Sequence, residues 1–104
     1  MNATRFVPIT LALVLLLTAG QAAADEATAI TNGCMACHAL DKKVVGPAFK
    51  SIANKYKGDA AAADKLSRQV RAGNKGVWGA IPMPPQTKIS DADLKKVVAW
   101  ILAQ

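Results

Sequence analysis

The sequence predicts a small all-α domain of about four helices, and three observations support that fold class. Prolines, serines and glycines stand where helices begin or end, as at Pro47, Gly58, Gly73 and Ser90. No stretch alternates apolar and polar residues in the way of a half-buried strand. Apolar residues recur at helical spacing near the end of the chain: Leu94, Val97, Val98, Ile101 and Leu102.

The start of the chain has the features of a secretory signal. Arg5 supplies a positive charge, residues 9–17 are almost wholly apolar, and Ala22-Ala23-Ala24 offers a cleavage site. The apolar stretch is short for a membrane span, although an uncleaved membrane anchor is the alternative. We therefore expect a signal peptide over residues 1–24, a mature domain over residues 25–104, export to the periplasm, and no stable membrane insertion after cleavage.

The mature domain would have 80 residues, so it forms one domain whose core is marginal without a staple such as a buried prosthetic group. Without Arg5 it carries 12 basic against 7 acidic residues, a formal charge of +5. No nucleic-acid motif accompanies this charge, so we expect no nucleic-acid partner and weigh a cationic docking face against an ordinary solvated surface. The candidate lysines are Lys42, Lys43, Lys50, Lys75 and Lys88.

The first two helices are expected over residues 25–33 and from Pro47 to Lys57. Gly33 relaxes the backbone at the end of the first helix. Pro47 suits a first helical position, because its φ is already helical and its missing N–H would have no partner there. Gly58 can end the second helix, whose apolar residues recur at helical spacing: Ala48, Phe49, Ile52, Ala53 and Tyr56.

A third helix and a long loop are expected between residues 60 and 89. The helix covers residues 60–72, with Leu66 and Val70 facing inward and Gly73 at its end. Residues 74–89 have no helical period and are rich in glycine and proline, yet they hold several apolar side chains. A loop of that length and composition in so small a domain indicates a functional segment rather than a disordered one.

The last helix begins after Ser90, which we expect to cap it. Asp93 stands three residues on, as a weaker form of the capping-box glutamate, and Ile89 can pack against Leu94 as a hydrophobic staple. Trp100 lies off the apolar stripe of this helix and is expected to border a second contact.

The sequence Cys34-Met35-Ala36-Cys37-His38 is typical of a c-type haem attachment site. Two thiols at this spacing can each add to one haem vinyl group, and the adjacent imidazole can bind the iron. The two cysteines and the one histidine of the chain all lie in these five residues. The alternatives are a thioredoxin-like dithiol, which normally follows a strand, a plain disulfide, and a zinc site, which lacks further Cys or His ligands.

A sixth iron ligand would have to come from elsewhere in the chain, from water, or from a lysine. Met1 is lost with the signal, and Met35 lies inside the attachment motif, too close to reach the opposite haem face. Met83 remains, held between prolines that reduce the entropy lost when its backbone is ordered. The alternative for Met83 is an ordinary core side chain.

Three segments together resemble the small bacterial class I cytochromes c, the cytochrome c-551 (c8) group. These are Cys-Met-Ala-Cys-His-Ala at 34–39, Val-Gly-Pro-Ala-Phe at 45–49 and Gly-Val-Trp-Gly-Ala-Ile-Pro-Met-Pro-Pro at 76–85. The resemblance covers essentially all of residues 25–104. It implies about four helices wrapped around one covalently bound haem c.

The resemblance also implies a role for particular residues. Cys34 and Cys37 would form thioether bonds, and His38 and Met83 would bind the iron. The Pro47 carbonyl would accept the Nδ1 hydrogen of the histidine and raise its basicity. The indole of Trp78 would reach a haem propionate.

The chain departs from the pattern of this group in two places. Gln86 stands where the group often has an asparagine tied to the methionine loop. A propionate-binding arginine of relatives corresponds to Gln69, which leaves open whether Arg68 or Arg71 substitutes for it.

The function implied is single-electron transfer in the periplasm by a protein that is not an enzyme. We expect a monomer that takes electrons from a quinol–cytochrome c reductase-type donor and passes them to a nitrite reductase, an oxidase or a similar acceptor. Two alternatives stay open. One is an enzyme or gas sensor in which Met83 is a labile ligand, and the other is a haem subunit bound permanently in a respiratory complex.

Overall fold

The computed structural model describes residues 24–104, and the predicted signal peptide lies almost entirely outside them. Residues 24–31 are helical, followed by a single 3₁₀ turn, η1 (Cys34–Ala36), and three further helices. These are α2 (Phe49–Lys55), α3 (Ala62–Ala72) and α4 (Asp91–Leu102). The described residues contain no strand, only isolated bridges at two places, so the predicted all-α class is confirmed.

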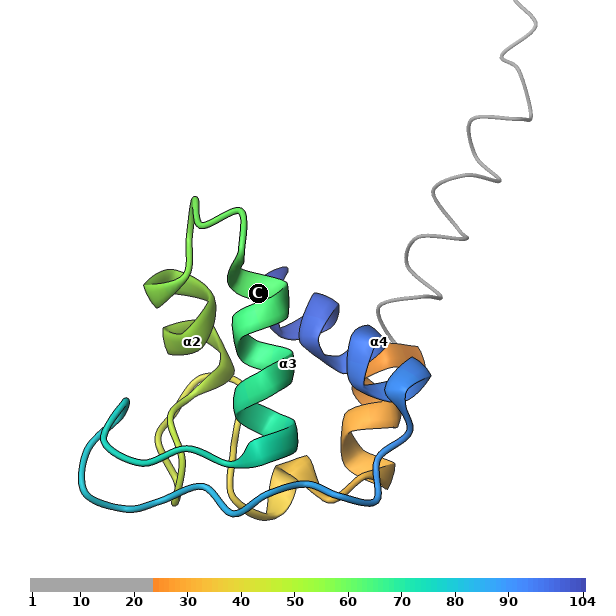
Figure 1. Ribbon diagram of the computed structural model, residues 1–104, viewed down its shortest axis with the longest axis horizontal. Coiled ribbons are helices and arrows are strands. Elements are labelled where there is room, and N and C mark those ends of the chain that lie inside the picture. The colour runs from red at the N-terminus through yellow and green to blue at the C-terminus, as the bar shows by residue number, and fades with distance from the viewer. Residues whose placement is uncertain (1–23) are drawn as a thin grey trace, which may run out of the picture.

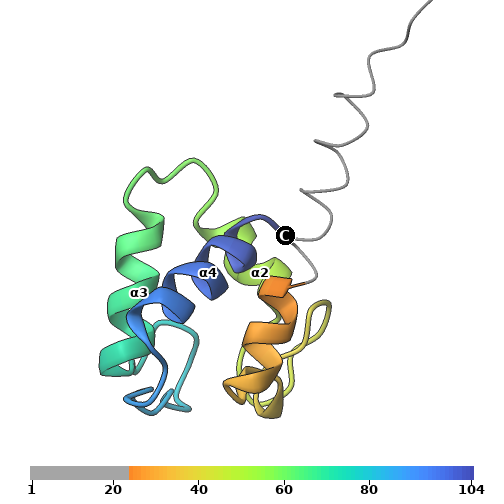
Figure 2. The same cartoon turned by 90° about the vertical axis from the view of Figure 1, so that its right-hand side faces the viewer.

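Helix α4 is the central element of the fold. It packs against both α2 and α3, and the N-terminal helix lies beside its first turns (Figures 1 and 2). Ala29 of that helix is fully buried in the core, and Asn32 donates a 3.5 Å hydrogen bond to Asp93. None of the helices described in residues 24–104 has the length and apolar character needed to cross a membrane.

Because α4 is covered on more than one side, its apolar surface is wider than the predicted stripe. Trp100 is buried and meets the ring of Phe49 edge-on, at 5.2 Å between centroids. This is the second contact expected for Trp100. Ile89 and Leu94 are both buried in the same core, as expected for a staple.

The predicted N-cap of α4 is confirmed, but the full capping box is not. The Ser90 hydroxyl accepts the backbone N–H of Asp93 at 3.1 Å. The Asp93 carboxylate accepts the Asn32 amide instead of reaching back to the Ser90 backbone. The reason is tertiary, because the N-terminal helix presents a donor to this carboxylate.

Helix α2 is shorter than predicted, and Pro47 is not its first residue. The helix begins at Phe49, whose backbone N–H donates to the Ala39 carbonyl at 2.9 Å, and the N–H of Lys50 donates to Leu40 at 3.1 Å. The attachment segment therefore supplies the acceptors that a helix start needs. Pro47 stays outside the helix, which leaves its carbonyl free for another partner.

The long loop between α3 and α4 runs past the C-terminal end of α3 along one edge of the molecule (Figure 1). Gly73 ends α3 with a φ of 76°, as the sequence predicts for a terminal glycine. The buried Leu66 and the partly buried Val70 of α3 face the core, as expected. The loop and the attachment segment thus frame the side of the core on which the candidate site lies.

Candidate haem site

The attachment motif forms a compact turn that presents both cysteines to one cavity. Gly33 takes a left-handed conformation, with φ 77°, and η1 follows directly. Cys34 and Cys37 are free thiols, and both line the cavity. Burial raises the pKa of the half-buried Cys34 thiol, while a hydrogen bond from its own backbone acts in the opposite direction.

One ring nitrogen of His38 is hydrogen-bonded to the backbone, and the other is left to bind a metal. Its Nδ1 lies 2.7 Å from the Pro47 carbonyl oxygen. A carbonyl can only accept, so Nδ1 carries the hydrogen and Nε2 keeps the lone pair that a metal ligand requires. The ring stacks on Phe49, with 5.1 Å between centroids and 20° between planes.

Gly46 leaves the space that this histidine ring occupies. A Cβ added at Gly46 would lie 2.4 Å from Cε1 and 2.8 Å from Nδ1 of His38. The backbone N–H groups of Val45 and Gly46 both donate to the Cys37 carbonyl, at 3.2 and 2.7 Å. The Val-Gly-Pro segment is thus tied to the attachment turn and forms a close-fitting wall for the imidazole.

Met83 lines the same cavity from the loop before α4. Its backbone is paired with Asn74 in both directions, by N–H to carbonyl distances of 2.9 and 3.1 Å. The Asn74 side-chain amide lies 3.8 Å from the Met83 sulfur. Gly73 permits the close approach, because an added Cβ would meet the Met83 carbonyl oxygen at 2.7 Å and the Pro85 nitrogen at 2.9 Å.

The cavity between these two ligand candidates is lined mainly by apolar side chains, and the helices that contribute them are α2, α3 and α4. The cavity is partly open to solvent. Val45 and Ile81 border it and are 49% and 64% exposed. The deeper lining includes Phe49, Ile52, Leu66, Val97, Val98 and Ile101.

The donor set fits a covalently bound haem. The cavity combines two free thiols, an imidazole with Nε2 free of the Pro47 hydrogen bond, and a thioether. Imidazole and thioether are axial ligands used by cytochromes c, and thiols are the groups that add to haem vinyls. The structure therefore brings Cys34, Cys37, His38 and Met83 together at one cavity.

Trp78 also lines this cavity. The Lys55 ammonium lies 5.3 Å from the centroid of its ring, at a distance suited to a cation–π contact. This contact brings a positive charge from α2 to the face of the indole. The role of Trp78 toward a propionate stays a prediction.

Gln86 and the three side chains considered as partners of a haem propionate have different surroundings. Gln69 lines the cavity and donates to the Tyr56 hydroxyl at 3.1 Å. Arg68 is exposed. Arg71 directs its guanidinium to the loop that follows Met83. Gln86 turns its side-chain amide to the Pro84 carbonyl, at 3.0 Å.

Comparison with known proteins identifies the family to which this chain belongs. The family model for cytochrome c matches residues 19–104. The chain belongs to the cytochrome c family. Members of this family carry covalently attached haem c with its iron and act as electron carriers, so this chain is a small cytochrome c electron carrier rather than an enzyme.

Individual relatives agree with the family match. This cytochrome is 50% identical over 93 residues to cytochrome c-552 of Nitrosomonas europaea, covering 89% of this chain and 90% of the relative. It is 46% identical over 92 residues to cytochrome c-551 of Allochromatium vinosum, covering 88% and 98%. The crystal structure of wild-type Nitrosomonas europaea cytochrome c552 superposes with a TM-score of 0.73 at 49% identity, covering 75% of this chain and 96% of that one.

Sequence reasoning did not identify two residues that shape the site. The sequence could have indicated Gly46, because this glycine stands between the valines and Pro47 in a segment that resembles the family. No local pattern could have indicated Asn74, because its contact with Met83 joins residues nine positions apart across a loop.

Proposed function

We propose that this cytochrome transfers single electrons through a haem held by thioether bonds from Cys34 and Cys37 and ligated axially by His38 and Met83. The observation that carries the proposal is the 2.7 Å contact between His38 Nδ1 and the Pro47 carbonyl at a cavity that Met83 also lines. The contact orients the imidazole and leaves Nε2 for the iron.

Each of these residues has a defined part in the transfer. The bound haem supplies the ferric–ferrous couple. The Pro47 carbonyl, by accepting the imidazole hydrogen, makes His38 a stronger donor. The soft sulfur of Met83 favours the ferrous state and raises the potential. If His38 and Met83 both bound the iron, no coordination position would be left for a substrate, which is the property that separates a carrier from an enzyme.

We further propose that residues 1–24 are a cleaved signal and that the mature protein acts in the periplasm as a monomer. Its donor would be a quinol–cytochrome c reductase-type complex and its acceptor a nitrite reductase, an oxidase or a similar protein. Val45 and Ile81, exposed at the cavity border, suit a small contact of the kind that transient redox partners make. The N-terminal residue of the purified protein, expected to be Asp25, tests the cleavage.

The ferric spectrum of the purified holoprotein tests the axial ligands. We expect a low-spin spectrum with a thioether–iron band in the wild type, and loss of that band in Met83→Ala. The midpoint potential of Met83→Ala should also fall, within the roughly 0.8 V range over which axial ligands tune haem. Imidazole should bind the opened site.

Met35→Ala is the matched control, because Met35 packs against the core from within the attachment turn. It should keep both the band and the potential. Equal behaviour of the two variants would contradict ligation by Met83. A high-spin ferric wild type would instead favour an enzyme or a gas sensor.

A further inference from the structure

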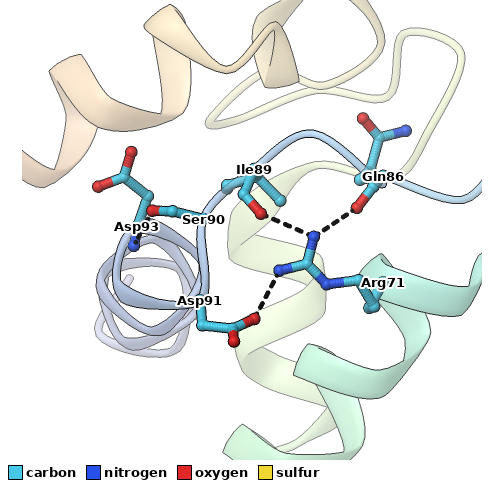
Figure 3. A network of polar contacts seen from close by, with 6 residues as sticks. All are labelled: Arg71, Gln86, Ile89, Ser90, Asp91 and Asp93. Atoms are coloured by element: carbon cyan, nitrogen blue, oxygen red, sulfur yellow. Dashed lines mark hydrogen bonds and ion pairs between the residues drawn. The ribbon is translucent and has the colours of Figure 1, made fainter.

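Arg71, near the end of α3, bridges the loop that follows Met83 to the start of α4 (Figure 3). Its Nη1 donates to two backbone carbonyls, those of Gln86 at 2.9 Å and Ile89 at 2.7 Å. Its Nη2 lies 2.9 Å from a carboxylate oxygen of Asp91. One planar guanidinium thus joins three groups of one segment, a geometry that a lysine ammonium on its flexible stem does not reproduce.

Two of these groups, the Gln86 and Ile89 carbonyls, belong to residues 84–90, which form the C-terminal limb of the methionine loop. One further backbone bond ties this limb to α3, from the Gln86 N–H to the Val70 carbonyl at 3.0 Å. Met83 itself is paired with Asn74 through its backbone N–H and carbonyl. The Met83 side chain therefore projects from a stretch of chain that α3 and the residues just after it fasten both at Met83 and after it.

We propose that Arg71 is a positioning residue for the sixth iron ligand, holding the limb after Met83 closed through the Gln86 and Ile89 carbonyls. Arg71 is not among the residues that line the cavity, so it acts through the loop and not by touching the cofactor. This inference rests on the proposed ligation by Met83.

The positive charge of the Arg71 guanidinium explains why the loss of its hydrogen bonds should loosen the limb enough to measure. Hydrogen bonds from a charged group are about twice as strong as neutral ones, and two carbonyls lose their partner at once when the guanidinium is removed. The Asp91 carboxylate is fully exposed in the ion pair, so the ion pair itself contributes little. The carbonyl contacts, rather than the salt bridge, keep the limb in place.

The consequence is a low population of states in which Met83 has left the iron. An added ligand binds in proportion to that population, because the apparent dissociation constant equals the intrinsic one divided by the competent fraction. Weakening the contacts that hold the limb raises the fraction of molecules in which Met83 has left the iron. The apparent affinity for the added ligand rises with that fraction.

The test is a titration of the ferric holoprotein with imidazole, followed through the thioether–iron band. Arg71→Met removes the donors and keeps an unbranched apolar stem. We expect an increase of about tenfold in imidazole affinity, since tenfold corresponds to about 1.4 kcal/mol, together with a slower return of the band after imidazole is removed. Asp91→Asn keeps both carbonyl contacts and should stay within about twofold of the wild type.

A stability control separates positioning from general loosening of the fold. Ala53→Gly weakens α2 at a residue outside the cavity lining, and should leave imidazole affinity near the wild-type value. Equal affinities in Arg71→Met and Ala53→Gly would overturn the proposal, as would an effect of Asp91→Asn as large as that of Arg71→Met.

The same experiment distinguishes failure of this proposal from failure of the proposed ligation. A wild type without a thioether–iron band contradicts ligation by Met83 itself. A wild type with the band, and an Arg71→Met variant indistinguishable from it, contradicts the role of Arg71 alone. If Arg71→Met does not accumulate as folded protein, Arg71→Lys serves in its place, with an increase of several-fold in imidazole affinity expected and unchanged affinity as the contrary result.

Discussion

At the scale of single residues, His38 and Met83 reach the cavity by different means. The partners of His38 are close in sequence: Pro47 accepts its hydrogen and Gly46 leaves room for its ring. Met83 depends on Asn74, which holds it by its backbone and approaches its sulfur. The first arrangement is a property of one short segment, whereas the second requires two ends of a loop to meet.

Replacement of Gly46 should disturb the histidine directly. In Gly46→Ala the added methyl would overlap the His38 ring, so either the ring or the segment that ends in Pro47 must move, at a cost of about 1–3 kcal/mol. We expect a lower guanidinium midpoint, a weaker contact between His38 and the Pro47 carbonyl, and a shifted midpoint potential. Denaturant unfolding and redox titration of the holoprotein measure these changes.

Gly58 provides the comparison for this variant. A Cβ there meets nothing within 4 Å, although its φ of 80° makes any side chain strained. Gly58→Ala should therefore lose stability without any change in potential. An unchanged potential in Gly46→Ala as well would show that the imidazole tolerates the methyl.

At the scale of elements, the turn before α3 has its own source of stability. Asp59 accepts the backbone N–H of Ala61 at 2.8 Å and the Lys65 ammonium at 2.7 Å. The hydrogen bond from Lys65, followed by that from Ala61, lowers the pKa of the Asp59 carboxyl below its ordinary value. The carboxylate thus helps to begin a helix whose N-cap residue, Ala61, makes no side-chain capping bond.

This shift predicts an acid-side change in stability. A carboxyl with a lowered folded-state pKa stabilises the fold at pH values above its unfolded pKa, about 3.9, and that contribution is lost as the pH falls through the lowered value. Asp59→Asn should therefore be less stable than the wild type at pH 7, and the difference should shrink as the pH falls below about 4 and disappear once the pH is below the lowered pKa. Urea midpoints measured across this range give the result, and a difference independent of pH would contradict it.

At the scale of the whole molecule, the core surrounds the candidate haem cavity instead of filling it. The largest fully buried side chains are Phe49 and Val98, and both line the cavity. A domain of about 80 residues has little other apolar surface to bury. The fold and the cofactor are therefore expected to depend on each other.

Removal of the attachment cysteines tests this dependence. The mature Cys34→Ala/Cys37→Ala chain, expressed in the periplasm without covalent haem, should lose most of its helical circular dichroism, because the cavity lining would be exposed to water. The wild-type holoprotein is the reference. A cooperative thermal transition with native-like helix in the variant would show that the core forms without its cofactor.

The sequence by itself determined the all-α class and several features of α3 and α4. The apolar stripe of α4, its Ser90 cap and the terminal Gly73 of α3 follow from periodicity and local backbone chemistry, and all three are present. The cavity-lining positions of Cys34, Cys37 and His38 follow from a motif of five residues. Such features are predictable because their interactions join residues a few positions apart.

Only the tertiary structure decided the contacts between distant segments. Helix α2 begins at Phe49 because carbonyls of the attachment segment accept its first N–H groups. Asp93 turns to Asn32, 61 positions away, instead of closing a capping box. Arg71 holds a limb that begins more than a dozen residues after it. No local pattern specifies such partners, because they depend on how loop closure and core packing bring the segments together, and that geometry exists only once the chain has folded.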